Sequence, residues 1–177
     1  MTVDSSRYTR VPFDAASYEA ETMRSNQDGS CPICKIASDP ASHGHHAIYR
    51  DSISIAFLNK WPALFGYCLL APLEHRVNVV ADFSEDEYAN LQRKVYRLGR
   101  ALSAAVPTDR LYVLSLGSHQ GNAHVHWHLA PLPPGVPYEQ QQVAAMTLAH
   151  GYLDIPAAEQ ADLTTRIRRL MEIDHTT

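Results

Sequence analysis

The sequence predicts an α+β domain: a mostly antiparallel sheet with one long helix, further helices at the C-terminus and an extension at the N-terminus. Two strand-like segments come first, one strongly periodic helical segment follows, and two more strand-like segments precede the C-terminal helices. Strands that are neighbours in sequence usually pair in space. A length of 177 residues suits one domain, and we expect residues 1–30 to be the extension, 31–134 the sheet domain and 135–177 a helical tail.

The composition is that of a globular protein and excludes two classes of partner. Apolar residues make up 45% of the chain, charged residues 19%, and the formal net charge is −4, so the sequence does not predict the broad basic surface that nucleic-acid-binding proteins use. No apolar run reaches membrane-spanning length, and the N-terminus lacks the apolar core of a signal peptide. We therefore expect a cytoplasmic protein without nucleic-acid or membrane partners.

Two strands are expected in the first half of the chain. Ser52–Leu58 alternates, with Ile53, Ile55 and Phe57 on one side, which is the period of a strand. Gly66–Ala71 is continuously apolar and fits a central strand that is covered on both faces.

The clearest helix runs from Ser84 to about Val106. Ser84 and Glu87 form the sequence pattern of a capping box, apolar residues recur at three- and four-residue intervals, and Pro107 marks the end. Further elements are expected at Leu111–Leu116 as a strand, and at Tyr138 to about Leu148 and Pro156 to about Ile173 as helices.

The chain is organised around Gly117–Pro134, which reads GSHQGNAHVHWHLAPLPP. Successive strand residues point to opposite faces, so three histidines in alternation share one face and the apolar residues between them can enter the core. A glycine-rich loop leads into this strand, and prolines are expected to end it because proline cannot donate to a ladder. The histidines are His124, His126 and His128, and the prolines are Pro131, Pro133 and Pro134.

Three interpretations of the histidine strand stay open on the residues alone. The histidines can simply occupy the polar face of a half-exposed strand, although three in regular alternation make this the minority interpretation. A His-x-His pair can hold a catalytic zinc ion that keeps an open water position. Alternatively, one neutral imidazole acts as a nucleophile at phosphorus while backbone N–H groups of the loop hold the phosphate.

The motif HVHWHLAPL resembles the signature of the histidine triad (HIT) family of nucleotide hydrolases and transferases, in which H-x-H-x-H is followed by apolar residues. Upstream, Phe57-Leu58-Asn59, Pro62, Gly66 and Pro72-x-x-His75 resemble the nucleoside-binding half of that family. The similarity covers residues 31–134, which it identifies as a HIT domain.

The resemblance implies catalytic and binding roles. His126 would attack the α-phosphorus of a nucleotide and form a nucleotidyl-histidine that water then hydrolyses. His128 would contact the phosphate and assist proton transfer, and the carbonyl of His124 would hold the other ring nitrogen of His126. Asn59 would bind the ribose hydroxyls. Phosphate contacts are expected from the loop residues Gln120, Asn122 and Ser118, and Ile53, Phe57 and Leu58 are candidate walls for the base, although we favour a core role for them.

The third histidine, His128, places the chain with the hydrolases of the family, because the transferase branch typically ends its triad in Gln. The expected substrates are nucleotides or dinucleotides: dinucleoside polyphosphates, nucleoside phosphoramidates or other adenylylated or guanylylated compounds. A phosphorylase or nucleotidyltransferase would follow the same covalent path, and a regulatory nucleotide-binding protein would hydrolyse only incidentally. The chain departs from the family at Tyr67, where many members have His.

Cys31-Pro-Ile-Cys34 has the spacing of half a zinc site. A redox role is the alternative, but the surrounding sequence does not resemble a thioredoxin-like strand and helix. Family members that bind zinc use two cysteines, a downstream histidine and the first histidine of the triad. The matching residues are Cys31, Cys34, His75 and His124, so the resemblance implies one structural zinc ion. The family usually pairs through its long helix and a neighbouring strand, which implies a homodimer.

Overall fold

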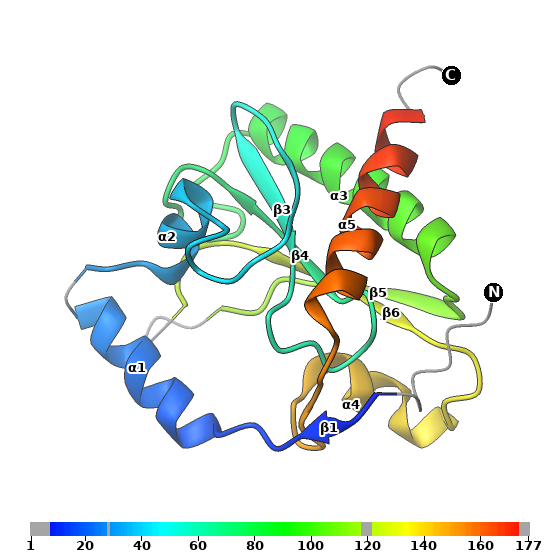
Figure 1. The fold of residues 1–177 in the computed structure, drawn as a ribbon. Coiled ribbons are helices and arrows are strands. Elements are labelled where there is room, and N and C mark those ends of the chain that lie inside the picture. The colour runs from blue at the N-terminus through cyan, green and yellow to red at the C-terminus, as the bar shows by residue number, and fades with distance from the viewer. Residues whose placement is uncertain (1–7, 28, 118–121, 174–177) are drawn as a thin grey trace.

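A five-stranded sheet forms the centre of the molecule, in the order β2-β3-β4-β6-β5 (Figure 1). Every neighbouring pair in it is antiparallel, which confirms the predicted fold class. The structure is a computed structural model and describes residues 8–27, 29–117 and 122–173. The strands are β2 (Ala47–Arg50), β3 (Ser54–Leu58), β4 (Cys68–Pro72), β5 (Arg110–Leu114) and β6 (Trp127–Leu132).

Helices α3 (Glu85–Ala105) and α5 (Ala157–Ile173) cover one face of the sheet and lie side by side in Figure 1. The capping box predicted at Ser84 is present: its hydroxyl accepts from the N–H of Glu87, and the Glu87 carboxylate accepts from the N–H of Ser84. The largest buried cluster joins these helices to the sheet. It includes Ala56, Leu58 and Leu70 of the inner strands, Leu98 and Leu102 of α3, Leu163 and Ile167 of α5, and Val125, Trp127 and Leu129.

The opposite face carries two smaller helices, α2 (Pro32–Ser38) and α4 (Gln141–Met146). Helix α2 packs on β3 and β4, while α4 packs on β6. Strand β3 is therefore buried on both faces. The predicted alternation holds for Ile55 and Phe57, which share the face that meets α2, whereas Ala56 and Leu58 join the α3 cluster on the other face. Ile53 precedes the strand and is 38% exposed.

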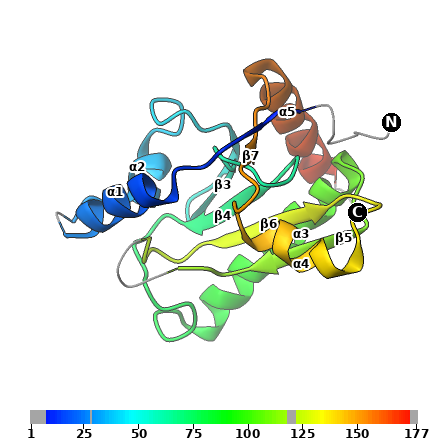
Figure 2. The same ribbon diagram turned by 90° about the horizontal axis from the view of Figure 1, so that it is seen from below.

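The N-terminal segment contains more regular structure than the sequence predicts. After β1 (Arg10–Val11), helix α1 spans Ala15–Gln27, and Figures 1 and 2 show it beside α2 and away from α4. The segment AASYEAETMRSNQ lacks the apolar stripe that reveals a surface helix. Strand β1 pairs with β7 (Tyr152–Leu153), so segments from the two ends of the chain meet.

Strand β6 corrects the expectation that all three histidines lie in one strand: it begins at Trp127, so only His128 belongs to it, and His124 and His126 precede it. The strand runs through Pro131 and ends at Leu132, directly before Pro133 and Pro134. The last residue of β6 that pairs with β4 is Leu129. Pro131 therefore pairs with β5 alone, and its lack of an N–H group removes no hydrogen bond to β4.

The helix expected at Tyr138 to about Leu148 is a short 3-10 turn (Tyr138–Gln140) followed by α4. Among the described residues no helix is long and apolar enough to cross a membrane.

Candidate functional site

A cavity of about 320 Å³ lies between α1, α2, the end of β3 and the histidine segment. Asn59, Asn122, His126 and His128, which the sequence singles out, all line it. Phe57 lines it as well, while Leu58 is turned into the core and Ile53 lies elsewhere. Ser118 and Gln120 lie outside the described residues. The remaining lining comes from α1 (Tyr18, Glu21, Thr22, Ser25), α2 (Pro32, Ile33, Lys35, Ile36) and His43, His45, Lys60, Trp61 and Leu69.

The ring of His126 is held in one tautomer. Its Nδ1 lies 2.6 Å from the carbonyl oxygen of His124, and a carbonyl can only accept, so Nδ1 carries the proton and Nε2 keeps its lone pair. The residue is 2% exposed, and this burial lowers the pKa of His126, although the bond to His124 opposes it. The imidazole is therefore neutral and presents a basic nitrogen.

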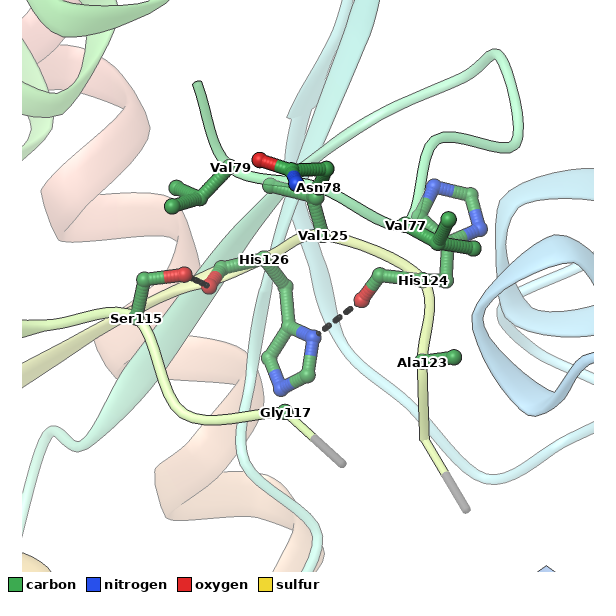
Figure 3. A pocket seen from close by; sticks show the side chains of 9 residues that line it. All are labelled: Val77, Asn78, Val79, Ser115, Gly117, Ala123, His124, Val125 and His126. Carbon is green, nitrogen blue, oxygen red and sulfur yellow. Dashed lines mark hydrogen bonds between the residues drawn. The ribbon is translucent and has the colours of Figure 1, made fainter. Parts of the chain in front are cut away.

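A second cavity of about 190 Å³ also borders His126 (Figure 3). Ser115 donates to the carbonyl of His126 at 3.0 Å, which fixes the backbone on that side. Figure 3 shows the ring pointing towards Gly117. A Cβ at Gly117 would lie 3.1 Å from the carbonyl oxygen of Asn122, so the loop closes tightly here because residue 117 has no side chain.

His128 meets a tyrosine that directly precedes the neighbouring strand β4. Its Nδ1 lies 3.2 Å from the hydroxyl of Tyr67, and the two rings are in edge contact at 5.8 Å. Burial lowers the pKa of His128 to about 4, with a smaller contribution from His126. Its Nε2 is buried and has no hydrogen-bond partner among the described residues. His126 and His128 lie with ring centroids 4.7 Å apart, so both rings reach the same part of the cavity.

Asn59 already uses one of its polar atoms. Its Oδ1 accepts from the N–H of Trp61 at 3.0 Å and caps the turn after β3. The side chain therefore offers the cavity its NH₂ group, a donor. The apolar side of the cavity comes from Phe57, with His45 in edge contact at 5.1 Å, and from residues of α2.

Cys31, Cys34, His75 and His124 form a compact cluster, with one ligand atom from each lying within 4.8 Å of all the others. Three sulfur–nitrogen distances are 3.4 Å (Cys31–His124), 3.3 Å (Cys34–His124) and 3.5 Å (Cys34–His75). Tetrahedral zinc with ordinary Zn–S and Zn–N bonds separates such atoms by about 3.5 Å. The donor set and the spacing are therefore compatible with zinc.

The orientation of His124 supports the same assignment. Its Nε2 lies 3.0 Å from the carbonyl oxygen of Pro72 and donates to it, which leaves Nδ1, the atom that faces both sulfurs, free to bind a metal. Burial lowers the pKa of His124 to about 4, so the ring is neutral, as a ligand must be. Burial also raises the pKa of the Cys34 thiol to about 11, with Cys31 adding to it; a bound cation would favour the thiolate.

Several residues of the site could not be found from the sequence. Tyr18 and Thr22 reach the cavity from α1, which has no apolar stripe to reveal it. Tyr67 is visible in the sequence as a departure from the family, but not as the partner of His128. Ser115 gives no sequence signal, because its hydrogen bond is to the backbone carbonyl of His126 in a separate segment of the chain.

Comparison with protein families places the triad in a known domain. The model of the HIT domain matches residues 42–134, just over half of the chain. An uncharacterized HIT-like protein of Saccharolobus solfataricus is 30% identical over 104 residues, which cover 57% of this chain and 73% of the relative. A second, from Mycoplasma genitalium, is 29% identical over 116 residues, or 63% of this chain and 77% of the relative.

Solved structures share the fold. A hypothetical histidine triad nucleotide-binding protein of Sulfolobus tokodaii superposes with a TM-score of 0.64 at 23% identity, covering 81% of this chain and 93% of that chain. A zinc-bound histidine triad family protein of Mycobacterium smegmatis gives 0.62 at 20% identity, with 84% and 98% covered. The matched domain, the 30% identical relative and the triad itself agree, and the chain belongs to the histidine triad (HIT) family.

Proposed function

We propose that this protein is a nucleotide hydrolase that cleaves its substrate at the α-phosphorus through a covalent intermediate on His126. The orientation of His126 carries the proposal. Its Nδ1 proton is committed to the carbonyl of His124, so the unprotonated Nε2 is the nitrogen available for attack. A neutral imidazole in a buried site is a competent nucleophile, because no proton must first be removed.

The proposed reaction proceeds by two displacements at phosphorus. Nε2 of His126 donates its electron pair to the α-phosphorus, and the bond from phosphorus to the leaving group breaks with its pair going to the leaving atom, which takes up a proton. Water then attacks the same phosphorus, loses its proton, and releases the nucleoside monophosphate and free His126. His128, 4.7 Å away between ring centroids, is placed to contact the phosphoryl oxygens and to assist proton transfer.

The nucleoside is assigned to the other end of the cavity. Asn59 would donate to the ribose oxygens with the NH₂ group that its turn leaves unused. The base would pack between Phe57 and the apolar residues of α2, of which Ile33 and Ile36 line the cavity. Loop residues Gln120, Asn122 and Ser118 remain our candidates for phosphate binding, and Asn122 lines the cavity.

We propose a structural role for zinc at Cys31, Cys34, His75 and His124. Bound there, the ion would be closed off by four protein ligands and would supply rigidity, not a reactive water. The geometry disfavours a zinc hydrolase that uses all three histidines, because Nδ1 of His124 faces the cysteines while Nδ1 of His126 is taken by a carbonyl. Chelation should then lower stability without removing the nucleophile.

We further propose that the protein is a homodimer that pairs along strand β5 and helix α3. Strand β5 is the last strand of the sheet, and Val113 on it is 45% exposed. Tyr96 of α3 is 62% exposed. Sedimentation that shows a monomer at micromolar concentration would contradict this assembly.

The stereochemical course at phosphorus tests the covalent route. Two displacements restore the original configuration, so hydrolysis of a substrate made chiral at the α-phosphorus should proceed with net retention. A nucleoside monophosphate should also be found on the peptide that contains His126 after a quench that avoids acid. Net inversion would contradict the covalent route. Parallel reactions with inorganic phosphate, analysed for nucleoside diphosphate, separate a hydrolase from a phosphorylase.

A further inference from the structure

The corner of the cavity beside Asn59 carries positive charge. Lys60 follows Asn59 in the turn after β3, and both residues line the cavity. His43 and His45 line it from the segment before β2. Burial lowers the pKa of His45 and the charge of Lys60 lowers it further, although a bond to a backbone carbonyl opposes both. Among the described residues of the lining, Glu21 of α1 is the one carboxylate.

The ammonium group of Lys60 is held in place by an aromatic ring. Its Nζ lies 5.2 Å from the centroid of the Trp61 ring, which is a cation–π contact. Trp61 is itself fixed by Phe13 and Tyr18, at 5.7 and 5.5 Å between ring centroids. On another side, a Cβ at Gly44 would lie 3.7 Å from Nζ. Among the described residues Lys60 forms no ion pair with a carboxylate, so its charge is available to a ligand.

The side chain of Asn59 offers a ligand hydrogen-bond donors. Its Oδ1 accepts from the N–H of Trp61, so the NH₂ group is the part left for the cavity. A ribose hydroxyl both donates and accepts, whereas a phosphoryl oxygen only accepts and so matches the NH₂ group and the neighbouring ammonium together. Nucleotide sites elsewhere make the same distinction, with a carboxylate for a free ribose hydroxyl and a cation for a ribose phosphate.

The proposed placement of the nucleotide leaves its sugar edge for this corner. The 5′-phosphate is assigned to His126 and His128, and the base to Phe57 and the apolar residues of α2. The part of the ribose that carries the 2′ and 3′ oxygens then faces Asn59 and Lys60. A second phosphate on either oxygen would meet an amide donor and an ammonium group from adjacent residues.

We propose that Asn59 and Lys60 form a subsite for a phosphate on the ribose, so that the substrates carry a 2′- or 3′-phosphate besides the α-phosphate that reacts. The inference rests on the proposed function and narrows its substrate class. Asn59 donates to the ribose phosphate and Lys60 neutralises part of its charge. Trp61 is the positioning residue, since it acts through both neighbours. The ribose phosphate is not a leaving group, so the two displacements at the α-phosphorus are unchanged.

The test measures the binding of three ligands to the whole protein by calorimetry: AMP, adenosine 3′,5′-bisphosphate and adenosine 2′,5′-bisphosphate. Lys60→Gln removes the positive charge. Asn59→Asp keeps an oxygen to accept from the N–H of Trp61 but replaces the NH₂ group with a negatively charged oxygen. Arg50→Gln is the charge-matched control, because Arg50 is exposed and does not line this cavity.

We expect wild-type protein to bind one of the two bisphosphates about tenfold or more tightly than AMP, the scale of a hydrogen bond to a charged group. Lys60→Gln should weaken binding of that bisphosphate by about tenfold and binding of AMP by less than about twofold. Asn59→Asp should reverse the preference, because its carboxylate repels the added phosphate and can accept from the hydroxyls of AMP. Arg50→Gln should keep the wild-type ratio of affinities.

Three results would overturn the subsite: equal affinities for AMP and both bisphosphates, a loss in Lys60→Gln that is the same for AMP and bisphosphate, or an equal loss in Arg50→Gln. The second would place Lys60 at the base or the 5′-phosphate, and the third would reduce the effect to net charge. Formation of the nucleotidyl adduct on His126 tests the proposed function separately. A preferred bisphosphate without any adduct would contradict the proposed function alone, and an adduct without the preference would contradict the subsite alone.

Discussion

His124 and His126 lie two residues apart, yet each is held through the opposite nitrogen of its ring. His124 donates from Nε2 to Pro72 and turns Nδ1 towards two sulfurs. His126 donates from Nδ1 to His124 and leaves Nε2 free. The carbonyl that each ring meets thus selects which nitrogen can react. The two orientations suit the metal binding proposed for His124 and the nucleophilic attack proposed for His126.

The two neighbourhoods differ in how completely their polar atoms are paired. In the cysteine–histidine cluster, each of the four ligand atoms lies close to the other three. In the cavity, Nε2 of His128 and Oδ1 of Asn122 are buried without partners among the described residues. Four ligand atoms that lie close together suit a permanently bound ion, while unpaired polar atoms in the cavity suit a ligand that binds and is released. Substitutions in the two neighbourhoods should therefore have different effects on activity and on stability.

Substitution of His126 should have the largest effect. His126→Ala should lower kcat by at least roughly thousandfold, because water does not replace a missing nucleophile at a comparable rate. Nucleotide binding should persist, since the contacts at Asn59 and Phe57 remain. Single-turnover kinetics and calorimetry measure the two quantities. His150→Ala is the matched control, because His150 is exposed and far in sequence from the triad. Activity within tenfold of wild type would rule out nucleophilic catalysis by His126.

Substitution in the cysteine–histidine cluster should mainly lower the free energy of unfolding, whereas substitution of His126 mainly lowers kcat. Cys31→Ser should abolish stoichiometric zinc and lower the free energy of unfolding by about 3–5 kcal/mol, in the range of effects caused by loss of a metal. Zinc content and denaturant unfolding measure this. Wild-type protein treated with a chelator should lose the same stability. Protein purified without chelator that holds less than half a zinc ion per chain would count against the site.

His128 should matter less than His126, because it assists and does not bond to phosphorus. His128→Ala should lower kcat by about a hundredfold, the scale of lost phosphate stabilisation and proton transfer. The nucleotidyl adduct on His126 should still form, and mass spectrometry after rapid quenching can detect it. A loss equal to that of His126→Ala, with no adduct, would contradict the division of roles.

Tyr67 should have the smallest effect. Tyr67→Phe keeps the ring in its contacts with Leu64 and Ala130 but removes the hydroxyl that lies 3.2 Å from Nδ1 of His128. Loss of one orienting hydrogen bond should reduce kcat by about tenfold or less, with KM nearly unchanged. Unchanged kcat would mean that packing alone orients His128.

The sequence predicts local features of this molecule better than distant ones. The capping box at Ser84 and the burial of Val125, Trp127 and Leu129 opposite the histidines follow from short-range patterns, and the structure confirms both. In strand β3 the alternation correctly places Ile55 and Phe57 on one face, which α2 covers, but it does not reveal that the face of Ala56 and Leu58 is buried as well, under α3 and α5. A short helix such as α2, placed beside a metal-binding pattern, gives little periodic signal of its own.

The candidate site divides in the same way. The short spacings of two motifs predict residues that lie together in the structure: Cys31 with Cys34 in the cysteine–histidine cluster, and His126 with His128 in the cavity. The contact between Tyr18 and Asn122 joins positions 104 residues apart, and no local pattern encodes such a meeting. The proline expected to end β6 is tolerated because β4 stops pairing before it, a fact about a neighbour and not about Pro131.

The pairing of β1 with β7 links the cavity to the order in which the chain is synthesised. Strand β1 finds its partner only after residue 153 has left the ribosome, whereas the triad and the cysteines are complete by residue 128. Gly151 adjoins this contact so closely that a Cβ there would lie 2.2 Å from the carbonyl oxygen of Val11. A nascent chain can thus hold all three histidines before the segment that precedes α1 meets its partner strand, and the wall that α1 adds to the cavity is anchored only after the triad has been synthesised.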